Sequence, residues 1–190
     1  MKRRKAIGGI LAFAGIGVTS FAAKEFFQIR SSVERGQLYK YSGLIAELVD
    51  VIIPPSDTPG AKEAEVHEYI IDFMESCASK KEYTNFFNGL SELREACLND
   101  YGTRFEECTM EKKIKIIKGL ADSDFSNAML AKIDAKLRGR SFFKILRALT
   151  IEGYCTSRAG VTELLAYQPI PARYEAITNI KPNQRAWATS

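Results

Sequence analysis

The sequence has one histidine, His67, and its four cysteines form no C-x-x-C pair. A single histidine excludes a multi-histidine metal site, and the cysteine spacings give no local support to zinc, haem c or iron–sulfur ligation. The sequence also lacks a nucleophile elbow, a P-loop and a glycine pattern for dinucleotide binding. These absences argue against most self-contained enzymes. We therefore predict no catalytic, cofactor-binding or metal-binding residues in this chain.

Net charge is also missing from the body of the chain. The formal charge of +4 equals the four positive charges of residues 2–5, Lys-Arg-Arg-Lys, so the remaining residues are neutral in sum. A neutral body gives no indication of nucleic-acid binding. The 190 residues, 46% hydrophobic and 26% charged, are typical of one globular domain with a real core.

The N-terminus has the pattern of an export signal. Four basic residues precede the uncharged residues 6–23, and Ser20 and Ala22 stand at the minus-three and minus-one positions if cleavage follows Ala22. The glycine-rich apolar run behind Arg3 and Arg4 resembles a twin-arginine signal, a route that carries folded cargo. We predict a twin-arginine-like signal peptide over residues 1–22, with an uncleaved membrane anchor and a Sec signal as alternatives. All three place the body outside the cytoplasm, because the positive charges precede the apolar run.

Apolar periodicity predicts an all-α fold, a single compact domain of about six helices over residues 41–175. Residues 23–40 are expected to form a linker or a short leading helix, and residues 176–190 a tail. The basic run at residues 112–118, KKIKIIK, is interpreted as a solvated helix face, with contact to anionic lipid as the alternative. The helices are expected to start near Ser42, Val66, Lys81, Thr109 and Ser141, with one more built around Met129, Leu130, Ile133 and Leu137.

Two loops rich in proline, glycine and polar residues stand out from the helices. A pair of prolines ends the first helix and opens loop 54–60, PPSDTPG. The turn-rich residues 153–160, GYCTSRAG, and the extended residues 168–174, QPIPARY, belong to the second loop. Loops of this composition hold fixed shapes and often form interaction surfaces. Trp187, an aromatic in a polar tail, is expected either to dock a partner or to fold back on its own domain.

The sequence leaves the redox state of the cysteines open. An exported body allows disulfides, and Cys77, Cys97, Cys108 and Cys155 permit three pairings. The alternative is that some of them are buried free thiols. Cys155 lies in the second loop, where it is a candidate for a disulfide or for a contact between subunits.

Several segments, in order along the chain, resemble the gluconate 2-dehydrogenase subunit 3 family. Together they span roughly residues 40–175, and Cys155 departs from the pattern because an aromatic is expected at its position. The segments are residues 52–61 (IIPPSDTPGA), 88–90 (NGL), 105–109 (FEECT), 150–157 (TIEGYCTS) and 167–171 (YQPIP).

This resemblance implies an accessory role in a periplasmic, membrane-linked dehydrogenase. In such complexes a large subunit of the glucose–methanol–choline type holds FAD and oxidises an alcohol or sugar hydroxyl. Electrons then pass to a cytochrome c subunit or to the quinone pool. The small subunit carries the export signal for both subunits through the twin-arginine translocase. FAD is thus expected in the partner and not in this chain.

The two loops are the contact surfaces that we predict for this partner, because proline and aromatic residues give rigid contact area. Two alternatives remain open: a membrane-tethered interaction module with an unrelated partner, and a stand-alone enzyme in which Glu63 makes His67 a general base. The predicted contact residues are Pro54, Pro55, Asp57, Thr58, Pro59 and Gly60 in the first loop, and Tyr154, Thr156, Ser157, Tyr167, Pro169, Pro171 and Tyr174 in the second.

Overall fold

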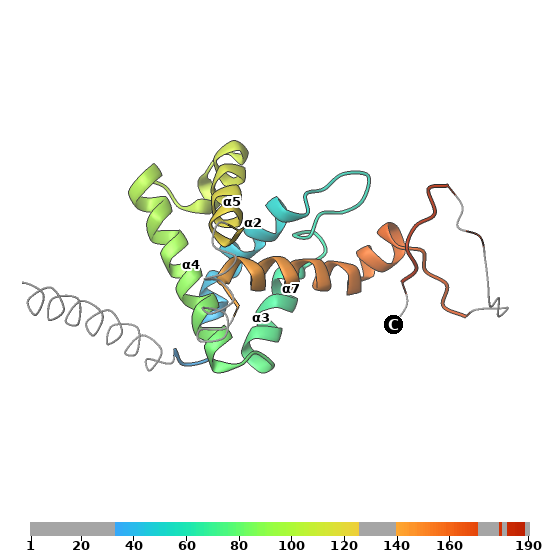
Figure 1. Ribbon diagram of the computed structural model, residues 1–190, viewed down its shortest axis with the longest axis horizontal. Coiled ribbons are helices and arrows are strands. Elements are labelled where there is room, and N and C mark those ends of the chain that lie inside the picture. Colours follow the sequence, from blue (N-terminus) through green and yellow to red (C-terminus); the bar gives the residue numbers. More distant parts are fainter. Residues whose placement is uncertain (1–32, 126–139, 171–178, 180–181, 189–190) are drawn as a thin grey trace, which may run out of the picture. The chain divides into compact units, whose positions relative to one another are not determined.

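A computed structural model describes residues 33–125, 140–170, 179 and 182–188. The chain divides into two units, Met1–Glu34 and Arg35–Ser190, and every helix named here belongs to the second. In chain order (Figure 1) the helices are η1 (Leu38–Tyr41), α2 (Ser42–Ile52), α3 (Val66–Ser76), α4 (Lys80–Tyr101), η2 (Phe105–Glu107), α5 (Met110–Phe125), α7 (Phe142–Thr156) and the π-helix η3 (Gly160–Leu164).

The all-α prediction is confirmed. Within the described ranges the backbone forms no β-strand, and its one β-type pairing is an isolated parallel bridge between Ala166 and Trp187. Among these residues, too, no helix has the length and apolar character that a membrane crossing requires. The helix predicted around residues 129–137 lies outside the described residues.

The helix boundaries follow local signals. α2 ends at Ile52, shortly before the two prolines of loop 54–60. α4 begins after Ser79, whose Oγ accepts a hydrogen bond from the Glu82 N–H at 3.3 Å. α4 ends before Gly102, which adopts a φ of 68°, the left-handed conformation that glycine takes without strain.

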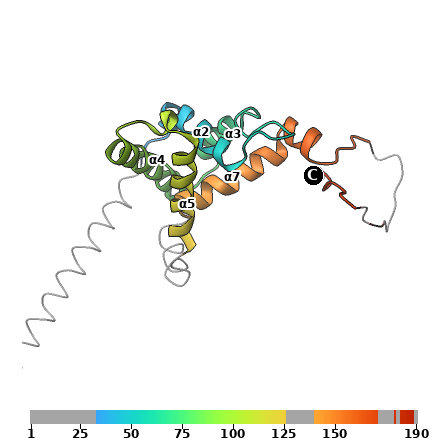
Figure 2. The same ribbon diagram turned by 90° about the horizontal axis from the view of Figure 1, so that it is seen from above.

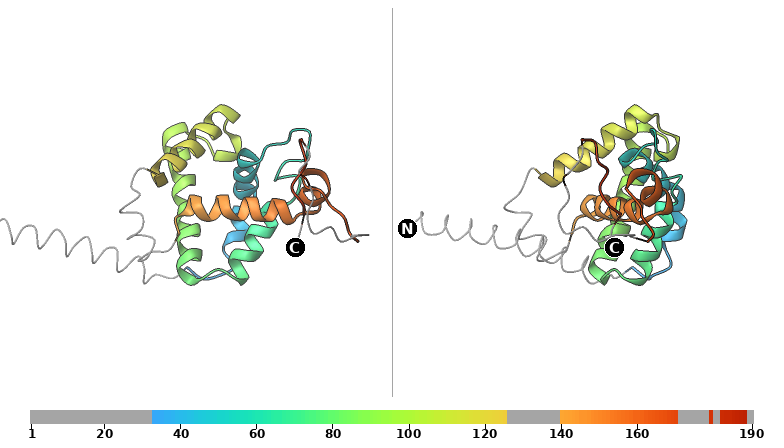
Figure 3. Two further views of the ribbon diagram at one scale, coloured as in Figure 1. Left: turned by 45° about the vertical axis from the view of Figure 1, so that its right-hand side comes forward. Right: turned by 90° about the vertical axis from the view of Figure 1, so that its right-hand side faces the viewer.

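Helix α7 lies at the centre of the domain. It contacts α2, α3, α4 and α5, and Figure 3 shows it beginning beside α4 and running past α3. Figure 2 shows this central position from above. Burial of each large apolar side chain in such a core contributes about 1.5–3 kcal/mol. Core side chains include Ile45, Leu48 and Val49 of α2, Ile70 and Met74 of α3, Phe86 and Leu90 of α4, and Ile145, Leu146 and Leu149 of α7.

Helix α7 is longer than the sequence predicted. It continues to Thr156, through the first residues of the segment that was expected to turn. Gly153 lies within this helix, at a point where a Cβ would be 2.6 Å from Tyr69 Cδ1 and 3.0 Å from Val66 Cγ1. Gly153 therefore serves a close approach of α3 to α7, and not a turn.

Replacing Gly153 with Ala is expected to lower the free energy of unfolding by about 1–3 kcal/mol, because the added methyl group forces α3 and α7 apart. Gly119→Ala is the matched control, since Gly119 lies within α5 and a Cβ there meets no atom within 4 Å. Ala should raise stability at that position by about 0.5–1 kcal/mol through helix propensity. Urea unfolding followed by circular dichroism measures both, and shifts of the same sign would contradict the close packing.

Hydrogen bonds hold the first residues of the domain in place. Arg35 donates from Nη1 to Met74 O at 2.9 Å and from Nη2 to Ala78 O at 2.6 Å, which satisfies carbonyls at the end of α3. The Glu75 carboxylate accepts from the Tyr83 hydroxyl at 3.0 Å and from two backbone N–H groups at the start of η1. Residues 35–38 are thereby held against α3 and α4.

Candidate functional site

Loop 54–60 is closed by contacts at its base. The Ala61 N–H donates to Ile53 O at 2.9 Å. Gly60 is buried, and a Cβ at this position would come within 2.9 Å of Pro55. Gly60 therefore shapes the base of the loop, and its role as a contact residue stays a prediction. Of the predicted contact residues in this loop, the structure leaves Pro54, Pro55 and Asp57 exposed and Thr58 and Pro59 half-buried.

Tyr154 joins this loop to α7 from inside the domain. Its side chain is 2% exposed, its hydroxyl donates to Pro59 O at 2.6 Å, and the same oxygen lies 3.2 Å from Thr58 Oγ1. The ring faces the interior of the domain, and the role of Tyr154 as a contact residue stays a prediction. Tyr154 holds loop 54–60 beside the end of α7, an arrangement visible in Figure 3.

The polar residues at the end of α7 bind their own backbone. Thr156 Oγ1 donates to Glu152 O at 2.8 Å. Ser157 Oγ donates to Tyr154 O at 2.8 Å and accepts from the Gly160 N–H at 3.0 Å. Gly160 is required here because a Cβ would collide with Tyr154 O. Thr156 remains exposed and Ser157 is half-buried. Of these two predicted contact residues, Thr156 is therefore the more accessible to a partner.

Beyond α7 the chain is largely exposed. Tyr167 is 54% exposed and Pro169 is also exposed. The other residues assigned to the second loop's surface, Pro171 and Tyr174, lie outside the described residues. The export-signal residues Arg3 and Arg4 lie outside them as well.

All four cysteines are free thiols, so no disulfide is formed among them. Cys97 and Cys108 are buried, and burial raises the pKa of the Cys97 thiol to about 11, which keeps it protonated. Cys77 is exposed, because it follows the last residue of α3 instead of continuing the buried face of that helix. Cys155, the candidate for an inter-subunit contact, is half-buried.

A buried ion pair connects α2 with α5. Lys113 Nζ lies 2.7 Å from Glu47 Oε2, and the Lys113 and Glu47 side chains are only 8% and 19% exposed. Glu47 Oε1 also pairs with Lys62 at 2.6 Å. Burial by itself raises the pKa of Glu47, but the hydrogen bonds from Lys113 and Lys62 outweigh it and hold this pKa below its usual value. The basic run at residues 112–118 is thus not wholly a solvated face, because Lys113 points inward.

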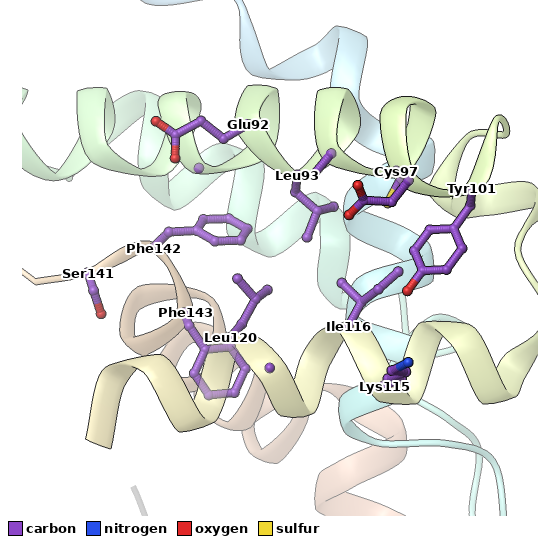
Figure 4. A pocket seen from close by; sticks show the side chains of 14 residues that line it. Glu92, Leu93, Cys97, Tyr101, Lys115, Ile116, Leu120, Ser141, Phe142 and Phe143 are labelled. Atoms are coloured by element: carbon purple, nitrogen blue, oxygen red, sulfur yellow. The ribbon is translucent and has the colours of Figure 1, made fainter. Parts of the chain in front are cut away.

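A groove of about 470 Å³ lies between α4, α5 and the start of α7. Figure 4 shows Leu93, Ile116 and Phe142 facing one another across it, with Tyr101 and Lys115 at one end. None of the predicted contact residues lines this groove, so it is separate from the surface around loop 54–60. The sequence held no signal for it, since its walls form only when the three separate helices pack together.

Comparison with known protein families gives one match. A family model described as gluconate 2-dehydrogenase subunit 3 matches residues 42–172, which is more than half of the chain. The chain belongs to the gluconate 2-dehydrogenase subunit 3 family. No curated protein and no solved structure matches it. The matched residues of this subunit 3 domain include loop 54–60, all of α7 and the exposed Tyr167, whereas Trp187 lies beyond them.

The catalytic alternative for the subunit 3 domain loses its geometric basis. α3 begins at Val66, so Glu63 lies in the preceding turn and not one helical turn before His67 on the same helix. Glu63 is exposed, while His67 Nδ1 is buried without a hydrogen-bond partner in the described part of the chain. The hypothesis of a Glu63–His67 general base is therefore not supported. No group of three or more histidine, cysteine or acidic side chains in these residues is arranged to hold a metal ion.

Proposed function

We propose that this chain is the non-catalytic small subunit of a periplasmic, FAD-dependent dehydrogenase complex that oxidises a sugar or an alcohol. In this proposal it supports assembly of the flavoprotein large subunit and its export through the twin-arginine translocase. The observation that carries the proposal is the family match over residues 42–172, which is consistent with a small subunit of a dehydrogenase complex. In this proposal FAD belongs to the partner, of the glucose–methanol–choline type, and electrons pass to a cytochrome c subunit or to the quinone pool.

The surface around loop 54–60 supports this role. Pro54, Pro55 and Asp57 are exposed on a loop that Tyr154 holds from below, so the loop presents a preformed shape. A preformed surface loses less conformational entropy on binding than a mobile one. Tyr167 and Pro169 extend the exposed surface beyond α7. We propose these residues as the part of the predicted contact surface that meets the large subunit.

Mild purification of the tagged full-length chain from its own cells tests the proposal. We expect a flavoprotein in stoichiometric amount, identified by mass spectrometry and by the absorbance of its bound FAD. A colourless chain without a partner, under conditions that preserve other membrane-linked complexes, would contradict it. An unrelated partner without flavin would instead favour the alternative, a membrane-tethered interaction module.

Replacing Arg3 and Arg4 together with Lys is expected to leave both the chain and its flavoprotein in the cytoplasm. The change keeps the charge but removes the two guanidinium groups, which ammonium groups do not replace in their hydrogen-bonding geometry. Immunoblots of periplasmic and cytoplasmic fractions measure the effect, and Lys5→Arg is the charge-matched control. Continued export of the Arg-to-Lys variant would favour the Sec alternative. The intact mass of the exported wild-type chain distinguishes cleavage after Ala22 from a retained anchor.

A further inference from the structure

Exposed apolar side chains gather at one end of the domain. The described residues contain nine large hydrophobic side chains that are exposed, and five of them lie in the second half of α7 or beyond it. Such a concentration on the surface of a small domain marks a contact with another molecule. The five are Ile151 (46% exposed), Leu164 (40%), Tyr167 (54%), Ile170 (80%) and Trp187 (52%).

The tail is held beside the segment that follows η3. The Ala166 N–H donates to Ala186 O at 2.8 Å, and the Ala188 N–H donates to Ala166 O at 2.9 Å. Arg185 Nη1 donates to Glu163 O at 2.6 Å. These bonds place Trp187 next to a segment about twenty residues earlier in the chain. Trp187 therefore folds back on its own domain and still keeps half of its side chain in solvent.

This part of the chain has no core of its own. None of the residues 161–170 and 182–188 is buried. Their ordering costs conformational entropy, about 1–2 kcal/mol for each backbone residue, and the described residues offset it only by partial burial. The apolar side chains that stay exposed here favour a binding partner that covers them.

We propose that residues 164–170 and 185–187, called here the C-terminal surface, dock the flavoprotein large subunit through Trp187 and Ile170. Both side chains enter an apolar pocket of that subunit. This inference rests on the proposed function and names the anchors of the contact. Internal hydrogen bonds link this part of the chain to loop 54–60, because Tyr154 binds the loop and Ser157 joins Tyr154 to Gly160 at the start of η3.

A second copy of the chain fits this surface less well than the flavoprotein. The groove between α4 and α5 lies at the start of α7, whereas the C-terminal surface follows the end of α7. A second copy could use this groove only if each copy inserted its Trp187 into the groove of the other across a two-fold axis. A dehydrogenase subunit, in contrast, is the partner that the family itself indicates.

The test compares the variant Trp187→Ala/Ile170→Ser with Tyr39→Ala, using the tagged full-length chain and the flavoprotein that copurifies with the wild type. Tyr39 is the matched control, because it is 59% exposed on η1, outside the C-terminal surface. We expect the double variant to bind the flavoprotein about thirtyfold more weakly, the effect of losing a central aromatic anchor. Tyr39→Ala should bind within about twofold of the wild type. Arg185→Ala, which frees the tail but keeps the apolar side chains, should weaken binding by an intermediate factor.

The outcomes separate this inference from the proposed function. A wild-type chain that captures no flavoprotein contradicts the proposed function itself. A wild-type complex that the double variant forms equally well overturns only the role of the C-terminal surface. Loss of self-association in the double variant, measured by light scattering, identifies a second copy as the occupant and overturns the inference. Loss of membrane association with unchanged flavoprotein binding identifies a lipid surface and also overturns it. Equal melting temperatures of wild type and variants exclude unfolding as the cause.

Discussion

Tyr154→Ala is expected to lower the free energy of unfolding by about 3–5 kcal/mol, as for other buried aromatic side chains. The ring is 2% exposed, so its removal leaves a cavity between α7 and loop 54–60. The Pro59 carbonyl also loses its hydrogen-bond donor. Urea unfolding followed by circular dichroism measures the change, and the loop should become sensitive to proteases at the same time.

Two further variants isolate the causes of this loss. Tyr154→Phe keeps the ring and removes only the hydroxyl, so it should lower stability by about 1–1.5 kcal/mol. Tyr167→Ala is the surface control and should change stability by no more than about 0.5 kcal/mol, because Tyr167 is 54% exposed. A stable Tyr154→Ala variant that fails to bind the flavoprotein would contradict the structural role and support Tyr154 as a contact residue.

Lys113→Met is the second change with a large expected effect. The variant leaves the Glu47 carboxylate with Lys62 as its remaining cation, in a site where Glu47 is 19% exposed. We expect stability to fall by about 2–3 kcal/mol, somewhat less than for a completely buried pair. The double variant Glu47→Leu/Lys113→Met removes both charges and should recover most of the loss, because apolar pairs of similar volume replace buried ion pairs well. Thermal unfolding of the single and double variants measures the coupling.

The loss of stability caused by Lys113→Met should become smaller at low pH. The pKa of Glu47 is lower in the folded protein than its ordinary value of 4.5. The stabilisation from this pair is therefore complete above pH 4.5 and is lost as the pH falls through the lowered pKa. The difference between wild type and Lys113→Met should shrink on acidification through that window. A difference that stays constant would show that Lys113 acts through packing alone.

The helices were largely predictable because their signals are local. The prolines after α2, the apolar face of α3 and Gly102 after α4 each act on their own neighbours in the chain. The structure places the starts of α2, α3, α4, α5 and α7 within one residue of the predicted ones. The family was also recognisable from sequence, since its segments keep their order and composition.

The roles of individual side chains were less predictable. Tyr154 and Tyr167 were both predicted as contact residues of the second loop, yet one is buried in the core and the other is exposed. Gly153 opens a segment whose composition predicts a turn, but it lies inside α7. Its missing side chain instead lets α3 pack closely against this helix. Lys113 belongs to a run of lysines and still points inward, because Glu47 of another helix meets it there.

What the sequence by itself determined is the all-α class, the starts of α2, α3, α4, α5 and α7, and membership of the subunit 3 family. What only the tertiary structure decided is which face each residue presents, because burial depends on elements that are distant in the chain. Tyr154 is buried by loop 54–60, almost a hundred positions earlier in the sequence. Trp187 is positioned by its pairing with Ala166. Neither contact follows from local periodicity, because each joins residues that are distant in the chain: the Tyr154 contact spans α3, α4 and α5, and the Trp187 contact spans about twenty residues.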